Sequence, residues 1–263
     1  MKPKRAIMTR ELRHLCEQVR QLAEKMRKHL ARQAPDTAPK LVALYMFAKA
    51  YKSYQAAMLL YHQGFWQDAA SINRTLLELD FQARWLDKDR QAASKLFLRG
   101  AQLDRMRLMN NLKLAGDEET RVEADAILRE LERSNDVNKS WNHWWAKESS
   151  IKKLAKQAGC DRPYFVQYHP LSWFVHSSPI TIRYYLSDER TPAADCRPSL
   201  PNQRDHGFAE TLLSAAPGAL MDVLAVVDNI FDLKLQADFD RVGHAFQNFN
   251  EASLPAEASA ESR

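Results

Sequence analysis

GFWQDAASINRTLLELDFQARWL, residues 64–86, decides the fold class of this chain. Apolar side chains recur along it at three- and four-residue steps, at Ala69, Ile72, Leu76, Leu79, Ala83 and Leu86. This period is that of an α-helix with one apolar face, so we predict a helix over 66–86. Glycine often caps the end of a helix, so Gly64 marks the end of a second predicted helix over 40–63.

The rest of the chain repeats this helical pattern. It has 263 residues, is 45% hydrophobic and contains only 7 glycines, which leaves few turn signals for a β-protein. Long segments rich in Ala, Leu, Lys, Arg, Glu and Gln predict further helices over 9–32, 89–115, 118–133 and, more briefly, 149–159. We therefore expect an all-α fold, an antiparallel helical bundle of about seven to eight helices.

The expected organisation follows from the segments around these helices. It comprises a basic amphipathic N-terminal helix in 1–35, a helical core domain over 36–186, an irregular loop over 187–207, a C-terminal helix packing on the core over 208–250 and a disordered tail over 251–263. A cluster of three tryptophans is expected to anchor a connecting loop on the core, with base stacking or a membrane interface as the alternatives; it comprises Trp141, Trp144 and Trp145.

The charge of the chain is uneven along its length. The net charge is +5, but residues 1–33 carry ten basic and three acidic side chains, whereas 200–263 carry four and ten. The 9–32 helix also has a narrow apolar seam, which can pack on the same chain or pair with a second copy. We expect a protein partner or a homodimer through this helix, and RNA is a further candidate partner because of the basic charge. The alternative is that this charge faces water or the acidic C-terminal region.

The sequence predicts a soluble, cytoplasmic protein. Its cysteines are odd in number, far apart and without CxxC spacing, which favours a reducing compartment; they are Cys16, Cys160 and Cys196. The basic N-terminus lacks the apolar segment of a secretory signal. The most apolar run, 212–233, contains Pro217 and three aspartates, so we expect no membrane span.

No cofactor and no metal site is expected. A di-iron bundle needs two Glu-x-x-His pairs, and the chain has only the one that joins Glu11 to His14. It also lacks the His-Glu-x-x-His and paired Cys/His patterns of zinc sites, a Gly-rich phosphate loop before a lysine, and a Gly-x-Ser-x-Gly elbow. The common nucleotide-dependent and serine-hydrolase reactions are therefore disfavoured.

Two polar pairs stand within otherwise apolar helical segments. Arg74 and Glu78 are spaced i,i+4 among leucines and an isoleucine, and Ser172 and His176 have the same spacing in a helix expected to start at Pro170. Charged groups near a core need partners, so we expect these two helices to supply them to each other.

These residues carry a family resemblance. The run Gly64, Phe65, Ala69, Arg74, Leu77 and Glu78, followed by Tyr168, Ser172, His176 and Ser177, resembles an uncharacterised bacterial all-helical family, the domain of unknown function five-six-seven-seven. The resemblance covers residues 40–190. It implies an α-helical bundle in which the Arg/Glu and Ser/His pairs belong to the family pattern, and it supplies no established activity.

Two interpretations of the candidate site residues Arg74, Glu78, Ser172 and His176 remain open. In one they form a buried network that fixes helix register. In the other Arg74 binds an anion, Glu78 orients it, and His176 acts as acid or base with a pKa raised by Glu78. An alternative pair, Arg162 and His169, matches the Arg-x(4–6)-His spacing of HEPN-type helical ribonucleases.

The sequence thus favours a helical binding or scaffolding domain, an accessory protein in bacterial stress or phage defence. The alternative is a HEPN-like, metal-independent ribonuclease that uses an Arg/His pair. A site requires a cleft that solvent can reach, whereas a register network is sealed.

Overall fold

The computed structural model describes residues 8–116, 118–134, 150–176 and 206–252. Within these ranges the chain is all-α and contains no strand, which confirms the predicted fold class. The tryptophan cluster, most of the 187–207 loop and nearly all of the 251–263 tail lie outside the described residues.

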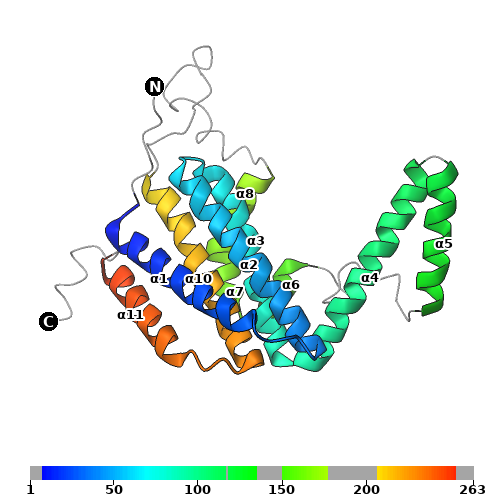
Figure 1. Cartoon of the computed structure of the whole chain (residues 1–263). Coiled ribbons are helices and arrows are strands. Elements are labelled where there is room, and N and C mark those ends of the chain that lie inside the picture. Colours follow the sequence, from blue (N-terminus) through cyan, green and yellow to red (C-terminus); the bar gives the residue numbers. More distant parts are fainter. Residues whose placement is uncertain (1–7, 117, 135–149, 177–205, 253–263) are drawn as a thin grey trace, which may run out of the picture.

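The helices agree closely with the periodicity of the sequence (Figure 1). In chain order they are α1 Arg10–Leu30, α2 Ala38–His62, α3 Trp66–Lys88, α4 Arg90–Ala115, α5 Glu118–Ser134, α6 Ile151–Ala158, α7 Asp161–Pro163, the π-helical turn η1 Tyr164–Tyr168, α8 His169–Val175, α10 His206–Phe231 and α11 Gln236–Ala252. The predicted cap at Gly64 is also confirmed. Gly64 has a φ of 89° and donates to Tyr61 O at 3.0 Å, while Phe65 N–H donates to Leu60 O at 2.9 Å, which is a Schellman motif.

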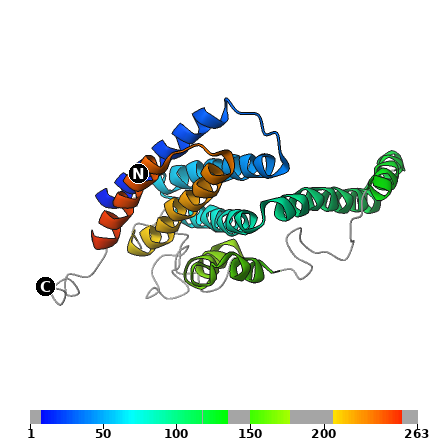
Figure 2. The ribbon, with the colours of Figure 1, turned by 90° about the horizontal axis from the view of Figure 1, so that it is seen from below.

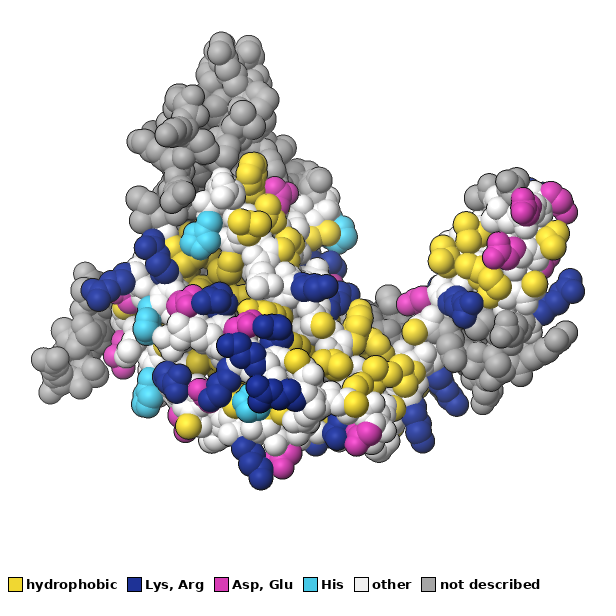
Figure 3. Space-filling view, in the orientation of Figure 1, with side chains coloured by type: hydrophobic (Ala, Val, Ile, Leu, Met, Phe, Trp, Pro, Cys, Tyr) yellow, Lys and Arg dark blue, Asp and Glu magenta, His cyan; other side chains and the backbone are white. Residues whose placement is uncertain are grey.

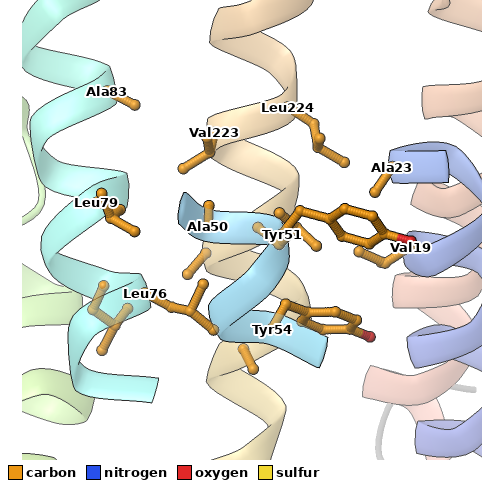
Figure 4. Packing of buried hydrophobic residues seen from close by; sticks show 14 of the residues in the cluster. Val19, Ala23, Ala50, Tyr51, Tyr54, Leu76, Leu79, Ala83, Val223 and Leu224 are labelled. Atoms are coloured by element: carbon orange, nitrogen blue, oxygen red, sulfur yellow. The ribbon is translucent and has the colours of Figure 1, made fainter. Parts of the chain in front are cut away.

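Three helices that pack against one another, α2, α3 and α10, form the centre of the molecule. On one side of this centre α1 and α11 run side by side, and on the other side α6 and α8 lie against α3 (Figures 1 and 2). Figure 4 shows Leu76 and Leu79 of α3 close to Tyr54 of α2 and Val223 of α10, and all four residues are at most 2% exposed. The stretch Ala209–Phe231 is long and apolar enough to cross a membrane, but 61% of its apolar window is buried inside this core.

The apolar seam of α1 packs on its own chain. Its six residues are at most 4% exposed, and they are Leu12, Leu15, Val19, Leu22, Met26 and Leu30. The helix contacts α11 and α10, and Lys25 forms a 2.6 Å ion pair with Asp238 of the acidic C-terminal region. The seam is therefore occupied within one chain. A homodimer through the 9–32 helix remains a prediction, and it would have to use the polar face of this helix.

The C-terminal segment 208–250, predicted as one helix, forms two. The chain reverses between α10 and α11, where Asp232 and Lys234 adopt positive φ values of 52° and 60°. The Asp228 carboxylate accepts a 3.3 Å hydrogen bond from Leu235 N–H and so holds the turn. This reversal lays α11 antiparallel to α10 and beside α1 (Figure 1).

The helix expected to start at Pro170 begins earlier. The backbone is helical from Asp161, and it widens at η1, where His169 N–H donates to Tyr164 O. Proline lacks an N–H and its ring crowds the carbonyl four residues before it, so a wider turn ahead of Pro170 relieves both conflicts. The widened turn aims Tyr168 and Ser172 at α3.

A helical arm leaves the body of the protein. The first part of α4 packs on α2 and α3, and its remainder runs outward and returns as α5 (Figures 1 and 2). Within this α4–α5 arm, Met106 and Leu128 are buried between the two helices, with Met109 and Ile127 packed beside them.

Candidate functional site

Four polar residues meet between α3 and the η1–α8 segment, and we call them the Arg74 cluster: Arg74, Glu78, Tyr168 and Ser172. Arg74 Nε donates to Ser172 Oγ at 3.2 Å, and its Nη2 donates to Tyr168 OH at 2.5 Å. The same nitrogen lies 3.1 Å from Glu78 Oε1, which also accepts the Tyr168 hydroxyl at 2.8 Å. Ser172 therefore supplies a partner to the Arg74/Glu78 pair, as predicted, and Tyr168 lies at the centre of the contact between the two helices.

Tyr168 contributes more than a hydrogen bond. Its ring lies under the Arg74 guanidinium at 4.8 Å and against Phe81 at 6.0 Å, and the residue is 3% exposed. Burial, together with the negative charge of Glu78, raises the pKa of Tyr168. The hydroxyl thus stays protonated and donates to Glu78. A cation stacked on a desolvated ring stabilises the contact further.

Access to the cluster is limited. The Arg74 and Glu78 side chains are 22% and 28% exposed, so both are largely shielded from solvent. Two of the three guanidinium nitrogens of Arg74 are bound to groups of the protein itself. This arrangement fits a brace between helices better than a site that receives an anion.

Among the described residues, neither histidine side chain bonds a side chain of this cluster. His176 caps α8 and is exposed; its backbone N–H bonds Ser172 O at 3.1 Å, and no hydrogen bond or ion pair among the described residues joins its side chain to Arg74 or Glu78. His169 is exposed and packs edge-on against Trp173 at 5.9 Å. Arg162 is exposed in α7, and within the described part of the chain no ion pair or hydrogen bond links it to His169.

A second polar cluster was not predicted from the sequence. Arg84 lies further along α3, where it forms a 2.6 Å ion pair with Asp80 and another ion pair with Asp222 of α10. Asp80 is 2% exposed, and burial raises its pKa to about 7, although the positive charge of Arg84 acts to lower it. Cys160 is buried nearby, and burial raises its thiol pKa to about 11. The i,i+4 spacing of Asp80 and Arg84 could have indicated this ion pair, because Arg74 and Glu78 have the same spacing.

No metal centre is evident in the part of the chain that the structure describes. Within it, no group of three or more His, Cys, Asp or Glu side chains could hold a metal ion.

The fold and the Arg74 cluster define the class of this protein. It is an all-α helical bundle in which an Arg/Glu pair on one helix bonds a Tyr/Ser pair on another. The chain belongs to the family of unknown function DUF5677, which matches residues 40–193. That match confirms the predicted resemblance, and it contains every member of the Arg74 cluster. No curated protein and no solved structure matches the chain.

Proposed function

We propose that this protein is a helical scaffold that associates with a second copy of itself through the α4–α5 arm. The observation that carries the proposal is the apolar surface that the arm exposes. Leu108 and Leu112 of α4 are 54% and 37% exposed, and Val122 of α5 is 62% exposed. Figure 3 shows hydrophobic side chains gathered both at the root of the arm and near its tip.

The placement of these residues favours a helical partner. Leu108 and Leu112 are one helical turn apart and therefore lie on one side of α4. Leu98, 37% exposed, lies nearer the root, where Leu41 and Tyr45 of α2 are also about half exposed. An apolar stripe along a projecting helix can be buried by another helix laid beside it.

The charges of the arm favour a second copy as that partner. Over 90–115, α4 carries six basic side chains and one acidic side chain, and over 118–129 α5 carries four acidic and two basic ones. Two arms related by a twofold axis would place α4 of one copy beside α5 of the other. Opposite charges then meet around the apolar stripe, and four helices pack as a bundle.

The Arg74 cluster has a supporting role in this proposal. Its hydrogen bonds tie α3, which contacts α4, to the η1–α8 segment, so they hold the base from which the arm projects. This is the register-fixing interpretation of the polar set.

The double variant Leu108→Glu, Leu112→Glu is expected to weaken self-association at least about tenfold, because two buried charges would face an apolar partner surface. Sedimentation equilibrium over a range of concentrations measures this. Leu59→Glu is the matched control, since Leu59 is a 61% exposed leucine of α2 outside the arm. A monomeric wild type, or equal weakening by the control, would contradict the proposal.

The ribonuclease alternative remains a prediction, and the exposure of both His169 and His176 keeps it testable. Metal-independent cleavage should persist with a chelator and be abolished by His176→Ala or His169→Ala with unchanged helical circular dichroism. Absence of cleavage by the wild type would end it. The accessory role in stress or phage defence likewise remains a prediction, to be checked against the neighbouring genes.

A further inference from the structure

The continuous helix formed by α7, η1 and α8 has two different faces. Its inner face packs on α3 and includes the buried Tyr168 and Leu171. Its outer face, which lies at the edge of the body on the side opposite α1, is open to solvent (Figure 2). Residues at three- and four-residue steps share one side of a helix, so this face presents a stripe about 20 Å long. We call it the η1 stripe; it comprises the exposed Arg162, Phe165, Val166, His169 and His176 and the half-buried Trp173.

Aromatic rings occupy the middle of the η1 stripe. Phe165 is 54% exposed, although large aromatic side chains are usually buried. Its ring is held by Tyr164, which packs against it edge-on with the two centroids 5.2 Å apart. Further along the stripe, His169 packs edge-on against Trp173. A ring that is held by a neighbour and open to solvent provides a surface on which another planar group can stack.

Positive charge lies beside these rings. The Lys152 ammonium of α6 is 5.2 Å from the centroid of the Phe165 ring, and Lys156 lies one helical turn further along α6. Over 150–176 the chain carries four basic side chains and one acidic side chain. Within the described part of the chain, no ion pair joins Lys152, Lys156 or Arg162 to a carboxylate. These three exposed cations are therefore available to the phosphates of a polyanion.

We propose that the η1 stripe binds single-stranded nucleic acid. Bases stack on the Phe165 and His169 rings, and phosphates pair with Lys152 and Arg162. A duplex fits less well, because its bases are stacked on one another and do not reach the rings. At the 3.4 Å spacing of stacked nucleotides, the stripe accommodates about six of them. The stripe lies outside the α4–α5 arm, so this binding is separate from self-association.

Fluorescence anisotropy of a fluorescein-labelled 12-nucleotide single strand tests the proposal. With the full chain at pH 7.5 and about 50 mM salt, both the RNA and the DNA strand are expected to bind with a Kd of about 10 μM or tighter. Three phosphate contacts predict binding about tenfold to twentyfold weaker at about 200 mM salt. A duplex of the same sequence is expected to bind at least about fivefold more weakly. Equal binding of the duplex, or no saturable binding of either single strand, would overturn the proposal.

Substitution of Phe165 tests the stacking surface. Phe165→Leu keeps an apolar side chain but removes the ring, so it is expected to weaken binding about tenfold, whereas Phe165→Trp is expected to preserve it. Because Phe165 is largely exposed, neither change should alter the helical circular dichroism. Binding by Phe165→Leu as tight as that of the wild type would show that no base stacks on this ring.

Substitution of the cations tests the position of the phosphates. Lys152→Gln combined with Arg162→Gln is expected to weaken binding about tenfold and to reduce its salt dependence. The matched control is Lys49→Gln combined with Lys52→Gln on α2, which also removes two exposed charges, one of them 5.9 Å from the centroid of a tyrosine ring. Equal weakening by the control would contradict the placement. Binding to phosphatidylserine vesicles in place of oligonucleotides would assign the stripe to a membrane surface and overturn the proposal.

Discussion

Arg74→Met is expected to lower the free energy of unfolding by about 2–3 kcal/mol. The change removes the hydrogen bonds to Ser172 and Tyr168 and leaves the Glu78 carboxylate without its cation in a site where it is 28% exposed. Breaking a fully buried ion pair costs about 3–5 kcal/mol, and the partial exposure of Glu78 reduces that figure. Urea unfolding followed by circular dichroism measures the difference.

The control for this variant is Arg90→Met. Arg90 also forms an ion pair, with Asp87 three residues before it, but its side chain is 40% exposed. The expected loss in the free energy of unfolding is therefore below about 1 kcal/mol. A double-mutant cycle of Arg74→Met with Tyr168→Phe should show coupling, because the hydroxyl that Tyr168→Phe removes accepts a hydrogen bond from Arg74. Equal losses for Arg74→Met and Arg90→Met would refute the brace.

Asp80→Asn is expected to change how stability depends on pH. The pKa of Asp80 is raised by burial from 3.8 to about 7, so between these values the folded state holds a proton that the unfolded state has released. Folding stability from this group therefore falls as pH rises through that window. Each pH unit over which only the folded state holds this proton lowers the stability by about 1.4 kcal/mol. Relative to wild type, Asp80→Asn should therefore gain stability as pH rises through this window.

Glu17→Gln provides a control of opposite sign. The hydrogen bond from Arg20 lowers the pKa of Glu17 to about 2, so its contribution to stability is present above its ordinary pKa of 4.5 and is lost as pH falls toward 2. Its effect therefore lies below the window of Asp80. Urea midpoints measured from pH 3 to pH 8 separate the two. A constant offset between Asp80→Asn and wild type across pH 4–8 would contradict the prediction for Asp80.

The helices were predictable because their signals are local. The apolar period of residues 64–86 places α3, and the Schellman glycine separates it from α2. The break between α10 and α11 was missed because its turn uses Asp232 and Lys234 at positive φ without a glycine. Non-glycine residues rarely adopt that conformation, so the sequence offers no typical stop signal there.

The candidate site was predictable only in part. The i,i+4 pairs named Arg74, Glu78 and Ser172, which the structure brings together, but they also named His176, whose side chain has no described bond to the acid or the arginine. The π-turn before Pro170 changes which side chains face α3. A helical wheel assumes a constant period, so it cannot predict this change. The Asp80–Arg84–Asp222 trio was missed because Asp222 is 138 residues from Arg84.

That long separation has a consequence for synthesis on the ribosome. The apolar face of α3 is covered by α10, which begins at His206, whereas α3 ends at Lys88. At typical translation rates the intervening residues take on the order of 10 s to emerge. During that time Leu76 and Leu79 lack their partner Val223, so the nascent chain presents an uncovered hydrophobic surface that chaperones recognise.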